Sequence, residues 1–278
     1  MLKNSFCHVP GIGAVYEQRL WSLGFDTWDA VLNRFSNVLA GKRFASLDQH
    51  LRRSTEELDN GNAVFFSSGL PTEEHWRIYG DFRHSVAYLD IETTGLRGGG
   101  NTITTIALYD GERVRCYVQG ENLADFEDDI QRYKLLVTYN GKCFDIPVIE
   151  ESFGMRFNAA HIDLRYVLGG LGYLGGLKTF EKQFGIDRGD LDGVDGYYAV
   201  LLWDEYARRG NEQALETLLA YNVQDVINLE TLMVAAFNEK LKRTPFRGSC
   251  EQAHATAPDV PWRAHPDTLR RIRERFLV

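Results

Sequence analysis

Residues 85–238 alternate between segments with the pattern of β-strands and segments with the pattern of α-helices, and this order constrains the fold more than any other feature. Three strand-like segments come first, SVAYLDIE, TITTIALYD and ERVRCYVQ, and the Asp110-Gly111 pair before the third is typical of a β-hairpin. A helical segment, the strand-like KLLVTYN, a second helix and the strand-like AAHIDL follow. We therefore expect an α/β fold with a five-stranded mixed sheet flanked by helices.

Three other zones surround this region. Residues 1–40 predict a small helical segment around the turn HVPGIGAVYEQRL, and residues 41–84 predict a connecting region. Residues 239–278 predict a linker rich in Pro, Ala and small polar residues, followed by the short basic helix LRRIRERFLV. That last helix could contact phosphates or could be a solvated amphipathic helix.

Residues 170–175 spell GLGYLG, which matches the glycine pattern of dinucleotide-binding proteins. That pattern requires a preceding strand, whereas the preceding DLRYVLG has a helical or turn-like pattern. We interpret GLGYLG as a loop and expect no nucleotide cofactor.

The net charge of −8 is distributed unevenly. Residues 61–239 hold 15 Lys and Arg against 28 Asp and Glu. Divalent cations could neutralise part of this charge, so nucleic acid is not excluded as a partner, but non-specific coating of DNA is disfavoured. The apolar runs are shorter than a membrane span, the N-terminus lacks a signal-peptide pattern, and the four cysteines have no metal-ligand spacing. We expect a cytoplasmic protein with no membrane partner.

The stretch VAYLDIETTGL places two carboxylates one residue apart on a strand of apolar residues. Alternate side chains of a strand share a face, so Asp90 and Glu92 project together while Ile91 points into the core. Two like charges on a semi-buried strand repel each other and lose solvation, and a divalent cation would relieve both costs. The alternative is that the strand ends here and both carboxylates are solvated.

Two more carboxylates and a phenol fit the first of these interpretations. Asp145 follows a strand, where α/β sheets often bind ligands, although it could simply be a helix N-cap. Tyr221 and Asp225 are four residues apart on one helix face, although they could be a solvated surface pair. Taken together, the four acids provide the oxygen ligands that two hard cations need for phosphoryl transfer.

DIETTGL, NGKCFD and YNVQD resemble, in order and spacing, the three exonuclease motifs of the DEDD superfamily, which has the ribonuclease H-like fold. Asp-x-Glu, Asn-x3-Phe-Asp and Tyr-x3-Asp are similar to the DEDDy branch, to which polymerase proofreading domains belong. The resemblance covers residues 85–238. It implies a two-metal nuclease that uses Mg²⁺ or Mn²⁺ to hydrolyse single-stranded DNA or RNA from the 3′ end.

The resemblance also implies a role for each site residue. Asp90 would bridge two metal ions, Glu92 and Asp225 would complete the nucleophile-side ion, and Asp145 would bind the other. Tyr221 would orient the attacking water, because its ordinary pKa near 10 makes it a poor base at neutral pH. The resemblance further implies contacts with the terminal nucleotide from three residues: Thr93, Leu96 and Asn140.

The N-terminal segment is similar to that of YprB-type bacterial ribonuclease H-like proteins and to a helix-hairpin-helix turn. In such a turn Gly11 and Gly13 let backbone N–H groups approach a phosphate, but few residues precede it here, so a turn that only packs a helical subdomain is an equal alternative. Asp163 and Lys178 could support the site or lie on the surface.

Two alternatives to an exonuclease stay open. The chain could keep the fold as a catalytically silent nucleic-acid-binding module, although all four carboxylates are present. It could also be a structure-specific endonuclease, if the path past the site is open.

Overall fold

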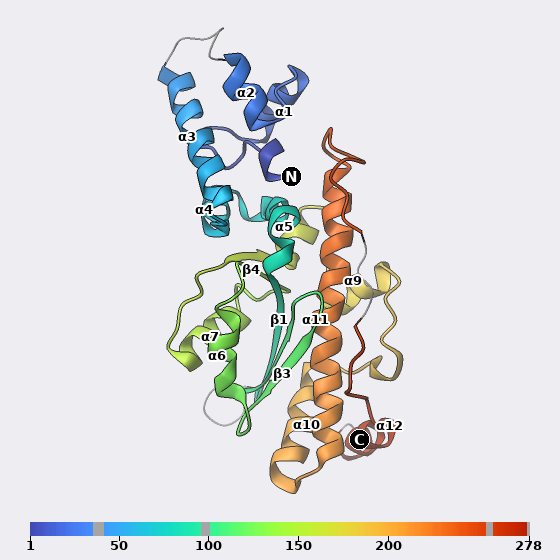
Figure 1. Cartoon of the computed structure of the whole chain (residues 1–278). Helices are drawn as coiled ribbons and strands as arrows, with labels where there is room; N and C mark the ends of the chain where they lie inside the picture. Colours follow the sequence, from blue (N-terminus) through green and yellow to red (C-terminus); the bar gives the residue numbers. More distant parts are fainter. Residues whose placement is uncertain (36–41, 96–100, 254–257, 277–278) are drawn as a thin grey trace.

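The structure is a computed structural model that describes residues 1–35, 42–95, 101–253 and 258–276. Five strands form one sheet in the order β3-β2-β1-β4-β5 (Figure 1). Strand β1 is antiparallel to β2 and parallel to β4, while β2–β3 pairs antiparallel and β4–β5 parallel. The predicted five-stranded mixed sheet is confirmed. The strands are β1 (Val86–Thr93), β2 (Ile103–Tyr109), β3 (Val114–Val118), β4 (Leu135–Thr138) and β5 (Ala160–Asp163).

Helices cover both faces of the sheet (Figure 1). The long helix α11 (Glu212–Leu241) lies along one face, and α6 (Phe126–Ile130) and α7 (Asp145–Phe153) lie on the other. Alternation along β1 follows these layers, because Leu89 and Ile91 pack in the cluster that includes α6 and α7, whereas Tyr88 packs in the cluster that includes α11. Residues 90 and 92 therefore face α11, and Ile91 points into the core as predicted.

Residues 1–35 and 42–82, the N-terminal segment, pack above the sheet as a group of helices (Figure 1). Its apolar core is continuous with the α11 side of the sheet, since Phe66, Tyr79 and Phe237 belong to one cluster. The helices are α1 (Ala14–Ser22), α2 (Trp28–Phe35), α3 (Lys42–Asp59), α4 (Ala63–Gly69) and α5 (Trp76–Phe82), with short 3₁₀ turns at Leu2–Asn4 and Thr72–Glu74.

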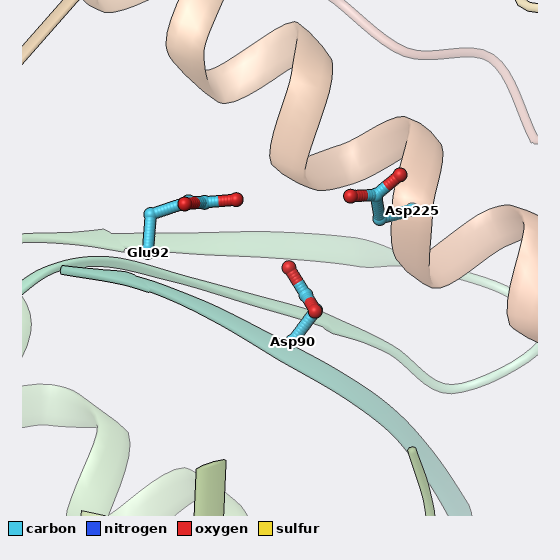
Figure 2. Close-up of side chains that lie close together, drawn as sticks. All are labelled: Asp90, Glu92 and Asp225. Carbon is cyan, nitrogen blue, oxygen red and sulfur yellow. The ribbon is translucent and has the colours of Figure 1, made fainter. Parts of the chain in front are cut away.

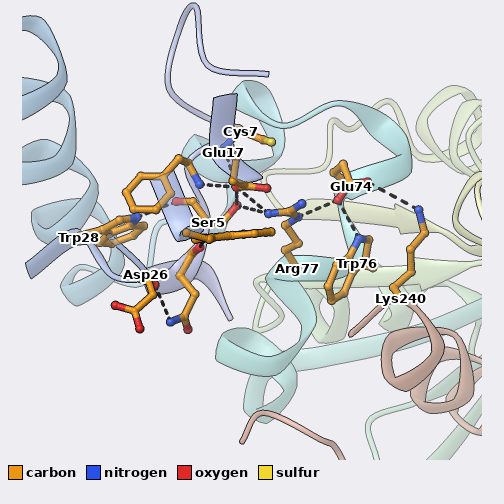
Figure 3. Close-up of polar contacts among 12 residues, drawn as sticks. Ser5, Cys7, Glu17, Asp26, Trp28, Glu74, Trp76, Arg77 and Lys240 are labelled. Atoms are coloured by element: carbon orange, nitrogen blue, oxygen red, sulfur yellow. Dashed lines mark hydrogen bonds and ion pairs between the residues drawn. The ribbon is translucent and has the colours of Figure 1, made fainter. Parts of the chain in front are cut away.

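A buried chain of charges joins this segment to α11 (Figure 3). Arg77 donates from Nη1 to Glu17 at 2.8 Å and from Nε to Glu74 at 2.7 Å, and Lys240 Nζ of α11 lies 3.6 Å from Glu74. The Arg77 side chain is 5% exposed and that of Glu17 1%. Buried ions need partners, so each charge fixes the position of the next and sets how the segment docks.

The remaining helices complete the α11 side of the molecule. Helix α8 precedes residues 170–175, so GLGYLG follows a helix, as predicted, and not a strand. Among the residues that the structure describes, no helix combines the length and the apolar character needed to cross a membrane. The helices are α8 (Leu164–Gly169), α9 (Leu177–Gln183), α10 (Gly196–Arg209) and α12 (Pro266–Phe276), with 3₁₀ turns at Arg83–Ser85, Leu123–Asp125 and Gly189–Leu191.

Candidate metal centre

Three carboxylates from two distant segments meet between β1 and α11 (Figure 2). Asp90 and Glu92 project from β1 towards Asp225 of α11, and each offers an oxygen within 4.8 Å of the others. Asp225 is 4% exposed, and the two strand residues are half-buried. Within the described part of the chain, these residues form an oxygen-only ligand group, which is the kind that Mg²⁺ and Mn²⁺ prefer.

The electrostatics of this group also fit a cation. Burial raises the pKa of Asp90 well above its ordinary value, and the charges of Asp225, Asp145 and Glu92 raise it further. Burial also raises the pKa of Glu92, again reinforced by Asp225 and Asp145. Carboxylates that resist ionisation when crowded together become stable anions beside a divalent ion. The residues present therefore fit a divalent metal.

Asn222 orients one of the three carboxylates. Its Nδ2 donates to Asp90 Oδ2 at 2.6 Å, and its own Oδ1 accepts from Thr105 Oγ1 at 3.0 Å. Asn222 is fully buried and lies three residues before Asp225, on the same face of α11. The sequence analysis missed this residue, although its place within YNVQD, three residues before Asp225, was a usable signal.

Arg188 supplies a cation on the other side of Asp225. Its Nη2 donates to Asp225 Oδ1 at 2.5 Å, and its Nη1 donates to both oxygens of Glu181 at 2.7 and 2.8 Å. The Arg188 side chain is 4% exposed, and its Nε is buried without a partner among the described residues. The pair favours the ionised form of Asp225, although burial is the stronger effect and raises the pKa of that carboxyl. Arg188 was not predicted, because it lies outside the three motifs.

Tyr221 lies one helical turn before Asp225 and is 4% exposed. Its hydroxyl accepts a hydrogen bond from Lys178 Nζ at 3.1 Å. Burial raises the pKa of Tyr221 far above 10, and the charges of Asp225 and Glu92 add to this, so the phenol stays protonated at neutral pH. Lys178, for which the sequence left two interpretations open, therefore contacts a site residue.

Asp145 lies apart from the three-carboxylate group but close enough for its charge to act on Asp90 and Glu92. The N-cap of α7 is Phe144, so the N-cap interpretation of Asp145 is wrong. Its Oδ1 instead accepts from the backbone N–H of Ile91 at 3.2 Å, which turns the carboxylate towards β1. Burial raises the pKa of Asp145 to about 7.

The other predicted site residues come from the end of β1, the segment after β4 and the N-terminal segment. Thr93 ends β1 and is 7% exposed, and Asn140 follows β4 with its side-chain oxygen accepting from Arg165 at 2.5 Å. Gly11 and Gly13 precede α1, which belongs to the group of helices outside the sheet (Figure 1). Leu96 lies outside the described residues.

One comparison with known protein families agrees with this architecture. A family model described as the RNase_H superfamily matches residues 87–237, more than half of the chain. The chain belongs to the RNase_H superfamily. Members of this superfamily are generally hydrolytic nucleases, and they typically use divalent metal ions.

Two individual proteins are also similar to this chain. The uncharacterized protein YprB of Bacillus subtilis (strain 168) is 27% identical over 252 residues, which cover 81% of this chain and 59% of YprB. This chain therefore spans less than two thirds of the length of that relative. A solved structure of the family B DNA polymerase from the hyperthermophilic archaeon Pyrobaculum calidifontis matches with a TM-score of 0.42 and 18% identity, over 56% of this chain and 24% of the polymerase.

Proposed function

We propose that this protein is a nuclease that uses two Mg²⁺ or Mn²⁺ ions to remove nucleotides from the 3′ ends of single-stranded DNA or RNA. The observation that carries the proposal is the convergence of Asp90, Glu92 and Asp225 within 4.8 Å of one another. Membership of the RNase_H superfamily supports a hydrolytic nuclease. Asp145, whose charge acts on the same group, is proposed as a ligand of the second ion.

When bound, divalent ions lower the pKa of a water and stabilise the leaving oxygen of a phosphodiester. Asp90, Glu92 and Asp225 would hold the metal through their carboxylate oxygens. Asn222 donates to one oxygen of Asp90 and so fixes the orientation of this carboxylate before the substrate arrives.

Tyr221 is proposed to orient the attacking water. Lys178 donates to its hydroxyl oxygen, so the phenolic hydrogen is left to point at an acceptor in the site. Because burial keeps this phenol protonated, Tyr221 acts as a hydrogen-bond donor and not as the base. Thr93, Leu96 and Asn140 are proposed to contact the terminal nucleotide.

The test is incubation of the purified protein with 5′-labelled single-stranded oligonucleotides and Mn²⁺. We expect a ladder that shortens from the 3′ end. Asp225→Asn should lower the rate by at least about a hundredfold, because it removes a charged ligand. Glu239→Gln, which alters an exposed acid near the end of the same helix, is the matched control and should cut normally.

The failure modes of this experiment are distinct. Internal cuts without shortening would indicate an endonuclease. Tight binding of oligonucleotide without any cleavage would indicate a catalytically silent module, and either result would overturn the proposal.

A further inference from the structure

Strands β1, β4 and β5 are parallel, so their carboxyl ends meet at one edge of the sheet. Tyr88 pairs with Val137, which places Asp90 level with the residues just after β4. Neighbouring strands lie about 4.8 Å apart, so the end of β5 is only about 10 Å from β1 across this edge. The segments that follow β4 and β5 therefore flank the acid group.

A single buried carboxylate holds these two segments together. Asp163, the last residue of β5, is 1% exposed and accepts from the backbone N–H groups of Asn140, Lys142 and Arg165 at 2.8, 3.1 and 3.0 Å. Asn140 has φ +63°, a left-handed conformation that non-glycine residues rarely adopt. A loop tied by three amides to one anion has one shape, and it presents its side chains in fixed positions.

The side chains that this scaffold presents are basic and aromatic. Arg165 is exposed, and Tyr166 is 41% exposed. Lys142 Nζ lies 6.0 Å from the centre of the Tyr166 ring. Cations gathered here stand out, because residues 61–239 as a whole carry a large excess of acid.

We propose that Lys142, Arg165 and Tyr166, the basic–aromatic surface, bind the single strand that leads to the acid group. Arg165 and Lys142 contact backbone phosphates, and the ring of Tyr166 stacks on a base. The Tyr166 ring can stack only on a base whose face is not covered by a neighbouring base, so the surface favours a single strand over a duplex. This inference rests on the proposed function and adds the path of the substrate.

The test measures binding of a labelled oligodeoxythymidine by fluorescence anisotropy. The oligonucleotide carries phosphorothioate linkages at its 3′ end, and Ca²⁺ replaces Mn²⁺ to limit hydrolysis. The variants are Lys142→Glu and Arg165→Glu. Their matched controls, Lys134→Glu and Arg156→Glu, reverse exposed cations before the amino ends of β4 and β5, at the opposite edge of the sheet.

We expect Lys142→Glu and Arg165→Glu each to weaken binding by about tenfold or more. Each should also reduce the slope of the logarithm of the binding constant against the logarithm of the salt concentration by about one. Tyr166→Ala should weaken binding of the single strand by about tenfold with an unchanged salt dependence. The amino-end controls should bind like the parent protein, and Mn²⁺ affinity should stay the same in every variant.

Two results would overturn the inference while leaving the proposed function intact. One is normal binding by Lys142→Glu and Arg165→Glu in a protein that still shortens oligonucleotides. The other is an equal loss in Lys134→Glu and Arg156→Glu, which would mean that net charge alone matters. A parent protein that neither binds nor cuts would overturn both proposals.

Discussion

Asn222 provides the sharpest test of how the metal centre is organised. Asn222→Ala removes the amide that donates to Asp90 at 2.6 Å and leaves the Thr105 hydroxyl without its acceptor. A hydrogen bond to a charged group contributes about 1.5–3 kcal/mol. Since about 1.4 kcal/mol is a tenfold change in affinity, Mn²⁺ should bind roughly 10- to 100-fold more weakly.

The same substitution should change the pH dependence of binding. The Asn222 amide lowers the pKa of Asp90, against the larger effect of burial, which raises it. Without the amide the pKa of Asp90 rises further, so more of the carboxylate is protonated at a given pH. Protons then compete more strongly with Mn²⁺, and the affinity of Asn222→Ala should fall more steeply than that of the parent protein as the pH decreases.

Isothermal titration with Mn²⁺ at several pH values measures both effects. Asn238→Ala is the matched control, because Asn238 lies on the same helix and donates to the Gln252 carbonyl near the far end of α11. Parent-like affinity in Asn222→Ala, or an equal loss in Asn238→Ala, would refute the role of Asn222.

Three further predictions concern buried titratable side chains. Arg77→Met leaves the buried Glu17 carboxylate without its cationic partner and should lower the free energy of unfolding, measured with urea, by about 3–5 kcal/mol. The double variant with Glu17→Gln should recover part of this loss, and a double variant no more stable than the single one would contradict the prediction. Burial lowers the pKa of His8 to about 3. Below about pH 6.5 the imidazole is therefore protonated in the unfolded chain, whereas in the native protein it stays neutral down to about pH 3. The stability contributed by neutral His8 should be complete above pH 6.5, and the free energy of unfolding should fall by up to about 1.4 kcal/mol per pH unit below it. His8→Gln should reduce this dependence of the free energy of unfolding on pH, and an unchanged dependence would contradict the prediction. Arg188→Met removes a cation that pairs with Asp225 and would compete with the metal for this carboxylate, so titration should show Mn²⁺ binding at least about tenfold more tightly. Weaker binding would contradict this and would mean that Arg188 mainly positions the carboxylate.

The order of elements and the faces of β1 were predictable from the sequence, because both depend on local periodicity. Alternation alone placed Ile91 in the core and its two acidic neighbours on the opposite face, and the Asp110-Gly111 pair marked the turn between β2 and β3. The motif order was enough to predict that segments more than a hundred residues apart, at Asp90 and Asp225, belong to one site.

Side-chain partners that depend on tertiary packing were not predictable. Asp145 occupies a position that suits an N-cap, yet its carboxylate bonds to the backbone of β1, a contact made only after the sheet and α7 pack together. Arg188 comes from the segment between α9 and α10, and only its burial against Asp225 reveals it. Glu17 and Arg77 have no sequence pattern that marks them as a buried pair.

The most direct test of the central claim is an anomalous difference map from a crystal soaked in Mn²⁺. We predict strong density within about 2.2 Å of carboxylate oxygens of Asp90, Glu92 and Asp225, with a second peak beside Asp145. A well-ordered site with no anomalous density at these carboxylates would contradict the claim that they form a metal centre.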